Sequence, residues 1–78
     1  MDVEKIQREM RARAEERIDV IAGPDAILLP KSLAAKVCGR SYTWVDNMVA
    51  AGRLPTVTVG RAKWVQRAAL VEALAVGI

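Results

Sequence analysis

The spacing of the apolar residues changes twice along this chain of 78 residues, and this pattern limits the folds that are possible. Between residues 31 and 51 the apolar side chains recur every three or four positions, which is typical of amphipathic helices. Over 56–59 the residues alternate, β-prone residues resume over 62–66, and the helical spacing returns over 67–76. The order helix, helix, hairpin, helix predicts a mainly α-helical fold with a small β-hairpin.

Gly39 separates the first two of these helical segments. Residues 31–38 predict a short helix, and Ser41 is a favourable N-cap for a second helix over 42–51, which Gly52 ends. Two short helices joined by a three-residue turn that contains Gly have the sequence form of a helix-turn-helix. The hairpin and the last helix that follow predict a winged helix-turn-helix.

Another helix precedes this unit. Apolar residues recur at helical spacing over 2–22, and Gly23-Pro24 ends the helix because Pro cannot continue it. The chain therefore divides into an N-terminal amphipathic helix, residues 1–25, and a winged helix-turn-helix domain, residues 26–78. The wing turns at Gly60, which supplies the positive φ that a hairpin turn needs. The apolar stripe of the first helix either packs back on the domain or pairs with a second copy.

The last helix is apolar almost all round, since only Arg67 and Glu72 interrupt it. A helix of this kind must bury more than one face. Together with the stripe on the first helix, this surface exceeds what one small domain covers, so we expect a homodimer or another protein partner. The residues expected at the self-association surface are Val3, Ile6, Met10, Ile18, Ile21, Leu70 and Leu74.

The charges are divided unevenly along the chain, whose formal net charge is +3. Residues 1–25 hold five basic and seven acidic side chains, a balance of −2, whereas residues 26–78 hold seven basic and two acidic ones, a balance of +5. An excess of positive charge on the second part favours a polyanionic partner, of which double-stranded DNA is the simplest.

Composition argues against catalysis. A single Cys forms neither an intrachain disulfide nor a zinc finger, and the lack of His removes the commonest general base. We expect no enzyme, no cofactor, no metal and no small-molecule substrate. No apolar run approaches the roughly 20 residues that span a bilayer, so no membrane partner is expected. A single Cys favours a reducing, cytoplasmic compartment.

Residues 27–75 resemble a known family. The motifs that carry the resemblance are Leu28-Leu29, Ala34-Ala35, Gly39-Arg40-Ser41, Val45, Gly52-Arg53-Leu54-Pro55, Val59-Gly60-Arg61, Trp64-Val65 and Leu70. This pattern resembles the excisionase-type branch of the MerR-like winged helix-turn-helix domains, which occur in small phage and mobile-element regulators. The resemblance implies a DNA-binding regulator or architectural factor, with helix 42–51 in the major groove and the wing near 60–63 on the DNA backbone. A nucleoid-associated place in the cytoplasm of a prokaryotic or phage-infected cell follows from the same resemblance.

The resemblance also implies which residues contact DNA. Those expected to face the major groove are Ser41, Tyr42, Thr43, Asp46 and Asn47, and those expected on phosphates are Arg40, Arg53, Arg61 and Lys63. An Asn side chain can read adenine, and a Thr methyl can contact thymine. Asp46 repels phosphates unless it accepts a hydrogen bond from a cytosine amino group.

Two other functions fit the same sequence. The lack of basic residues on helix 42–51 and the surplus apolar helix surface are consistent with a protein-interaction module that binds or inhibits another protein. The same kind of domain also serves as the DNA-recognition part of phage packaging subunits. For single residues, we expect Trp64 to fill the core between the sheet and the last helix, and Cys38 to act as a small buried apolar residue. Trp44 and Met48 are expected to pack against each other or against the N-terminal helix.

Overall fold

The computed structural model describes residues 2–76. Its elements, in chain order, are α1 (Val3–Ala22), β1 (Leu28–Pro30), α2 (Lys31–Cys38), α3 (Tyr42–Ala50), β2 (Thr56–Val59), β3 (Ala62–Gln66) and α4 (Arg67–Val76). The fold is mainly helical with a small three-stranded antiparallel sheet of order β1-β3-β2. The expected helices and hairpin are therefore present, and β1 is a third strand that the sequence pattern did not predict.

Local signals begin and end the helices. The Ser41 hydroxyl accepts a hydrogen bond from the Trp44 N–H at 3.1 Å, which confirms the expected N-cap of α3. Gly39 ends α2 in the left-handed conformation, with φ of 66°. Gly23 ends α1 with φ of 100° and ψ of 154°, a positive-φ conformation that favours glycine.

β3 is the central strand, and its register decides which side chains enter the core. Leu29 on β1 and Thr56 on β2 both lie opposite Val65, and Leu29 and Val65 are fully buried. Because successive side chains of a strand point to opposite faces, Trp64 lies on the outer face of the sheet, where it is half-buried. The expectation that Trp64 fills the core against α4 is therefore wrong, because Val65 takes that position.

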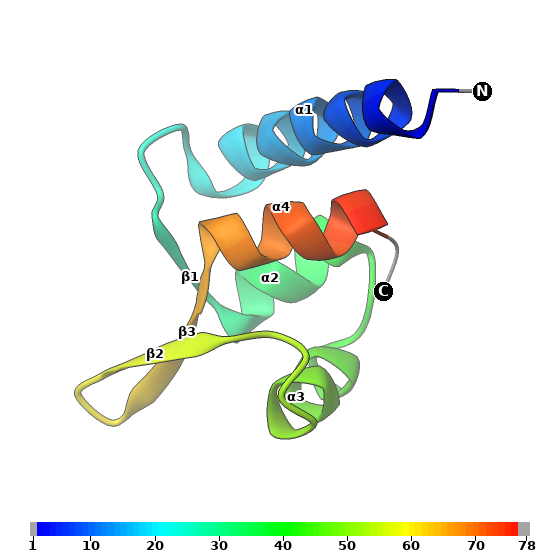
Figure 1. Ribbon diagram of the computed structural model, residues 1–78. Coiled ribbons are helices and arrows are strands. Elements are labelled where there is room, and N and C mark those ends of the chain that lie inside the picture. Colours follow the sequence, from blue (N-terminus) through cyan, green and yellow to red (C-terminus); the bar gives the residue numbers. More distant parts are fainter. Residues whose placement is uncertain (1, 77–78) are drawn as a thin grey trace.

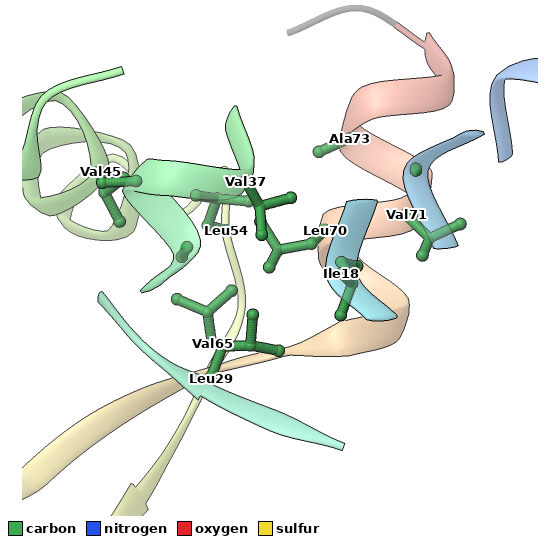
Figure 2. Close-up of a cluster of buried hydrophobic side chains, with 12 residues drawn as sticks. Ile18, Leu29, Val37, Val45, Leu54, Val65, Leu70, Val71 and Ala73 are labelled. Carbon is green, nitrogen blue, oxygen red and sulfur yellow. The ribbon is translucent and has the colours of Figure 1, made fainter. Parts of the chain in front are cut away.

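The core lies between the helices and the inner face of the sheet (Figure 2). Its largest fully buried side chains are Ile18, Leu29, Leu54, Leu70, Val37, Val45 and Val65. Trp44 and Met48 are partly buried and pack against this cluster. Cys38 is half-buried at its edge, and the burial raises the pKa of the thiol.

α1 and α4 run side by side (Figure 1). Ala14 and Ile18 of α1 are buried in the same core as Leu70 and Val71 of α4. The stripe of α1 thus packs back on the rest of the chain through this part of its surface. Ile18 and Leu70, which were expected to contact a second copy, are enclosed within the chain itself.

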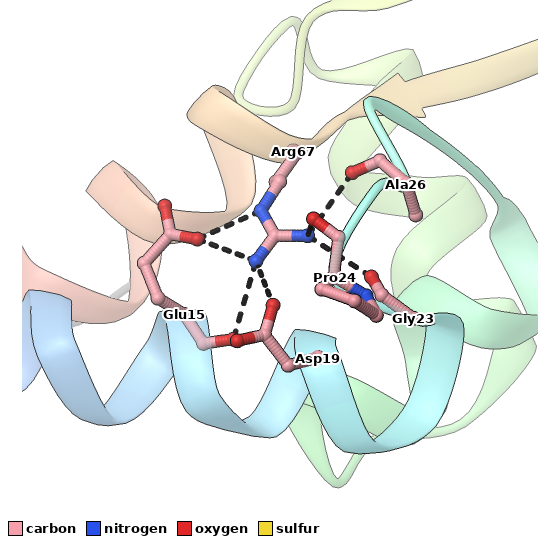
Figure 3. Close-up of polar contacts among 6 residues, drawn as sticks. All are labelled: Glu15, Asp19, Gly23, Pro24, Ala26 and Arg67. Atoms are coloured by element: carbon pink, nitrogen blue, oxygen red, sulfur yellow. Dashed lines mark hydrogen bonds and ion pairs between the residues drawn. The ribbon is translucent and has the colours of Figure 1, made fainter.

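Polar contacts reinforce the packing of α1 on the chain that follows it. Arg67, the first residue of α4, donates from Nε to the Glu15 carboxylate at 2.7 Å and also pairs with Asp19 (Figure 3). Its Nη1 donates to three carbonyl oxygens of the segment between α1 and β1, those of Gly23, Pro24 and Ala26, at 3.1–3.3 Å. The guanidinium therefore joins α1, the segment after it and the start of α4.

Among residues 2–76, none of the helices combines the length and the apolar character that a membrane-spanning segment needs.

Candidate nucleic-acid interface

A groove of about 500 Å³ lies where the start of α2, the start of α3 and the β2–β3 hairpin meet. Its polar lining consists of Lys31, Ser32, Tyr42, Arg61 and Lys63. Three of these, Tyr42, Arg61 and Lys63, were expected DNA contacts on two separate elements, and the fold brings them to one surface. Figure 1 shows α3 and the hairpin on the side of the molecule away from α1.

The hairpin presents its basic side chains because of its turn. Val59 lies opposite Ala62, so Gly60 and Arg61 form the connection between the strands. Gly60 has φ of 63°, and no non-Gly residue among those described has a positive φ. This confirms the expected role of Gly60 and leaves Arg61 exposed at the tip, with Lys63 exposed on β3.

The start of α2 adds hydrogen-bond donors to the groove. Pro30 occupies the N-cap position, and within the described residues no side chain caps this end of the helix. The first N–H groups of a helix have no partner inside it and favour an anion, such as a phosphate. Lys31 and Ser32, the first two residues of α2, line the groove beside these donors.

Lys31 also pairs with the one acidic residue expected on the DNA-facing surface. Its ammonium donates to the Asp46 carboxylate at 2.5 Å, and this hydrogen bond raises the pKa of Lys31. The ammonium offsets the negative charge of Asp46, so the repulsion expected between Asp46 and phosphates is reduced.

Lys31 and Ser32 were not among the site residues expected from the sequence. The signal that could have found them is local: a basic and a hydroxyl residue follow Pro30 directly, at the first turn of a helix.

The other expected contacts lie around the groove rather than in it. Ser41, Thr43 and Asn47 are exposed on or next to α3. The Arg40 guanidinium lies over the Trp44 ring, 5.3 Å from its centroid, which holds it beside α3. Arg53 is exposed after α3, where its backbone N–H donates to the Met48 carbonyl at 2.9 Å.

The residues expected to mediate self-association are divided by the fold. Val3, Ile6 and Met10 are exposed on α1, with 62%, 38% and 37% of their surface accessible. Ile21 and Leu74 are partly buried against the core. Only the first three of these thus remain largely available to another molecule.

Comparison with models of protein families, with curated proteins and with solved structures gives no match to this chain. A function for the protein therefore has to follow from its own residues. Among residues 2–76 there is no cluster of acidic, Cys or His side chains that could hold a metal ion. What the groove offers is positive charge, hydroxyl groups and helix-terminal N–H donors.

Proposed function

We propose that this protein binds double-stranded DNA as a winged helix-turn-helix domain and acts without catalysis. In this proposal α3 enters the major groove, and the β2–β3 hairpin is the wing that lies against the sugar-phosphate backbone. The observation that carries it is the basic groove in which Tyr42 of α3 meets Arg61 and Lys63 of the hairpin. Phosphate contacts of this kind supply much of the affinity of DNA-binding proteins.

The arrangement of α2 and α3 supports the proposal. The two helices pack against each other and are joined by a turn at Gly39, as in a helix-turn-helix. Thr43 and Asn47 are exposed on α3, where they can reach base edges. In such domains the N-terminal part of the second helix contacts the bases, which is the part that the groove borders.

The Lys31–Asp46 pair supports a mechanism for base selection. Asp46 accepts from the Lys31 ammonium in the free protein. A cytosine amino group in the major groove can replace that donor, and Lys31 then becomes available to a neighbouring phosphate. Asp46 would in this way favour cytosine while Lys31 contributes backbone affinity.

The resemblance of residues 27–75 to excisionase-type domains supports a role as a regulator or architectural factor of a phage or mobile element. The DNA-recognition part of a phage packaging subunit is a variant of the same proposal, because it requires the same DNA-binding surface.

The test is the binding of a labelled duplex of random sequence, measured by fluorescence anisotropy over a salt series and followed by selection of a preferred site. We expect affinity that falls steeply as salt rises, because each neutralised phosphate releases counterions. Selection should enrich one motif. If no duplex is bound even at low salt, the proposal is wrong.

The outer face of the sheet favours a second candidate function, that of a protein-interaction module. Val57 and Val59 of the edge strand β2 are 38% and 50% exposed, and Trp64 lies opposite Val57 on the same face. Exposed apolar surface on an edge strand is typical of sites that pair with another chain. A protein that binds no duplex at low salt would favour this second function.

A further inference from the structure

One face of α1, next to the face that packs on the core, is exposed and has a regular spacing of residues. Its residues are Val3, Ile6, Met10, Arg13, Arg17 and Val20, which we call the outer seam. They are spaced by three, four, three, four and three positions, the spacing of the a and d positions of a coiled coil. All six are exposed, Val3 to 62% and Val20 to 81%. The buried residues Ala14 and Ile18 lie on the neighbouring face of the same helix.

Two hollows lie along the outer seam. The larger, of about 490 Å³, is bordered by Arg13, Glu16, Arg17 and Val20, together with Ile21. Its first four residues are related as i, i+3, i+4 and i+7. Four residues in this relationship form the hole that receives one side chain of the facing helix in a coiled coil.

The second hollow, of about 180 Å³, has the same form. It is bordered by Met10, Arg13, Ala14 and Arg17, again i, i+3, i+4 and i+7, and Leu74 of α4 closes one side. The two hollows share Arg13 and Arg17, so they are consecutive positions for side chains of one packed helix.

We propose that this protein forms a homodimer in which the outer seam of α1 packs antiparallel against the outer seam of a second copy. In this pairing Val3 lies in one layer with Val20 of the second copy, Ile6 with Arg17, and Met10 with Arg13. Ile6 of the second copy enters the larger hollow, and Met10 enters the smaller one. The same contacts occur twice, as a two-fold symmetric interface requires.

Charge supports a second copy as the occupant and selects the direction of pairing. Parallel pairing would place Arg13 against Arg13 and Arg17 against Arg17, which is unfavourable, whereas antiparallel pairing places each against an apolar residue. The residues that precede Val3, Met10 and Arg17 are Asp2, Glu9 and Glu16. In antiparallel pairing Arg13 and Arg17 of each copy lie next to the acidic residues of the other copy, and their attraction offsets the repulsion between the two acidic rows.

This interface is independent of the proposed DNA-binding groove. The groove lies at α3 and the hairpin, on the side of the molecule away from α1 (Figure 1). It also differs from the self-association surface expected from the sequence, because Ile18 and Leu70 are enclosed in the core. Arg13, Arg17 and Val20 take their place.

The first test is sedimentation equilibrium of the full chain over a concentration series. We expect reversible association from the monomer of about 8.5 kDa to a dimer. The double variant Ile6→Lys, Met10→Lys should raise the dimer dissociation constant at least about tenfold, because each new ammonium would face the guanidinium of Arg17 or Arg13 of the second copy. Ala12→Lys is the matched control, since Ala12 is an exposed residue of α1 outside the outer seam.

Circular dichroism of each variant checks that the helix content is retained, which is expected because Ile6 and Met10 are exposed in the single chain. A protein that stays monomeric at every concentration overturns the proposal. So does a dimer that Ala12→Lys weakens as much as the double variant does.

The second test determines the direction of pairing by cross-linking. In a Cys38→Ser background, the variant Val3→Cys, Val20→Cys should form a covalent dimer under mild oxidation, since antiparallel pairing puts these positions in one layer. Val3→Cys alone should not, because its counterpart lies at the far end of the helix pair. Rapid cross-linking of Val3→Cys alone would show parallel pairing and contradict the proposal.

Discussion

Arg67 and Glu15, which are 52 positions apart in the sequence, are joined by a hydrogen bond of 2.7 Å from Nε to the carboxylate. The same guanidinium pairs with Asp19 and donates to the carbonyls of Gly23, Pro24 and Ala26 (Figure 3). A planar fork of donors suits this task, because it reaches carboxylates on one side and carbonyl oxygens on the other. Arg67 therefore fixes the position of α1 on α4.

Replacing Arg67 should destabilise the fold. We expect Arg67→Ala to lower the free energy of unfolding by about 2–3 kcal/mol, because two carboxylates and four carbonyls lose a charged donor. Arg67→Lys should recover part of this loss, since one ammonium retains the charge but not the fork. Urea denaturation followed by circular dichroism measures both variants.

The matched control is Arg11→Ala. Arg11 makes the other ion pair between α1 and α4, at 2.8 Å to Glu72, but both side chains are exposed. Exposed pairs contribute little to stability, so this variant should unfold close to the parent protein. Equal unfolding midpoints for Arg67→Ala and Arg11→Ala would contradict the role given to Arg67.

Features that depend on neighbouring residues were predictable from the sequence. Ser41 caps α3 through a bond to Trp44, three positions away, and Gly39 and Gly60 adopt the positive φ that their places between elements require. These signals act within one turn, so the sequence pattern contains them.

Features that depend on pairing between distant segments were not predictable. β1 is a strand because Leu29 pairs with Val65 of β3, and alternation alone does not show whether Trp64 or Val65 faces the core. From the sequence, Arg67 can be recognised only as a polar residue at the start of an apolar helix. Its hydrogen-bond partners lie 41 to 52 positions away, so no local pattern indicates them. The Lys31–Asp46 pair at the candidate site likewise joins two different helices.

Cys38 should react slowly and make stability depend on pH in the alkaline range. Its partial burial raises the pKa of the thiol, an effect that Arg17 and Arg40 reduce. Because the folded pKa lies above the unfolded one, this contribution to stability is complete below the unfolded pKa and is lost as pH rises through the folded pKa. Alkylation by iodoacetamide should therefore be slower in the folded protein than in urea.

The stability effect is isolated by comparison with Cys38→Ala, which lacks the titrating thiol but keeps every other group. As pH rises above about 8.5, the ordinary pKa of a thiol, the unfolding free energy of the parent protein should fall relative to that of Cys38→Ala. A difference that does not change with pH, together with equal alkylation rates in folded and unfolded protein, would contradict the prediction.

The hairpin should contribute to DNA binding through charge alone. Arg61→Ala and Lys63→Ala should each weaken binding to every duplex sequence and lower the slope of log affinity against log salt by about one unit. Arg8→Ala is the matched control, since it removes the same charge from an exposed position on α1. If the two hairpin variants and the control bind alike over the salt series, the hairpin does not contact DNA.

The Lys31–Asp46 pair should restrain DNA binding when the base sequence is wrong. Removing the carboxylate in Asp46→Ala frees the Lys31 ammonium for a phosphate, so affinity for random duplex and its salt slope should both increase. Lys31→Ala should have the opposite effect, and in the double variant the gain from Asp46→Ala should disappear, because no ammonium is left to release. Glu4→Ala, an exposed acidic position on α1, controls for the change in net charge. In site selection Asp46→Ala should also lose a preference for cytosine at one position of the motif. A gain in affinity no larger than that of Glu4→Ala would show that the Lys31–Asp46 pair has no part in recognition.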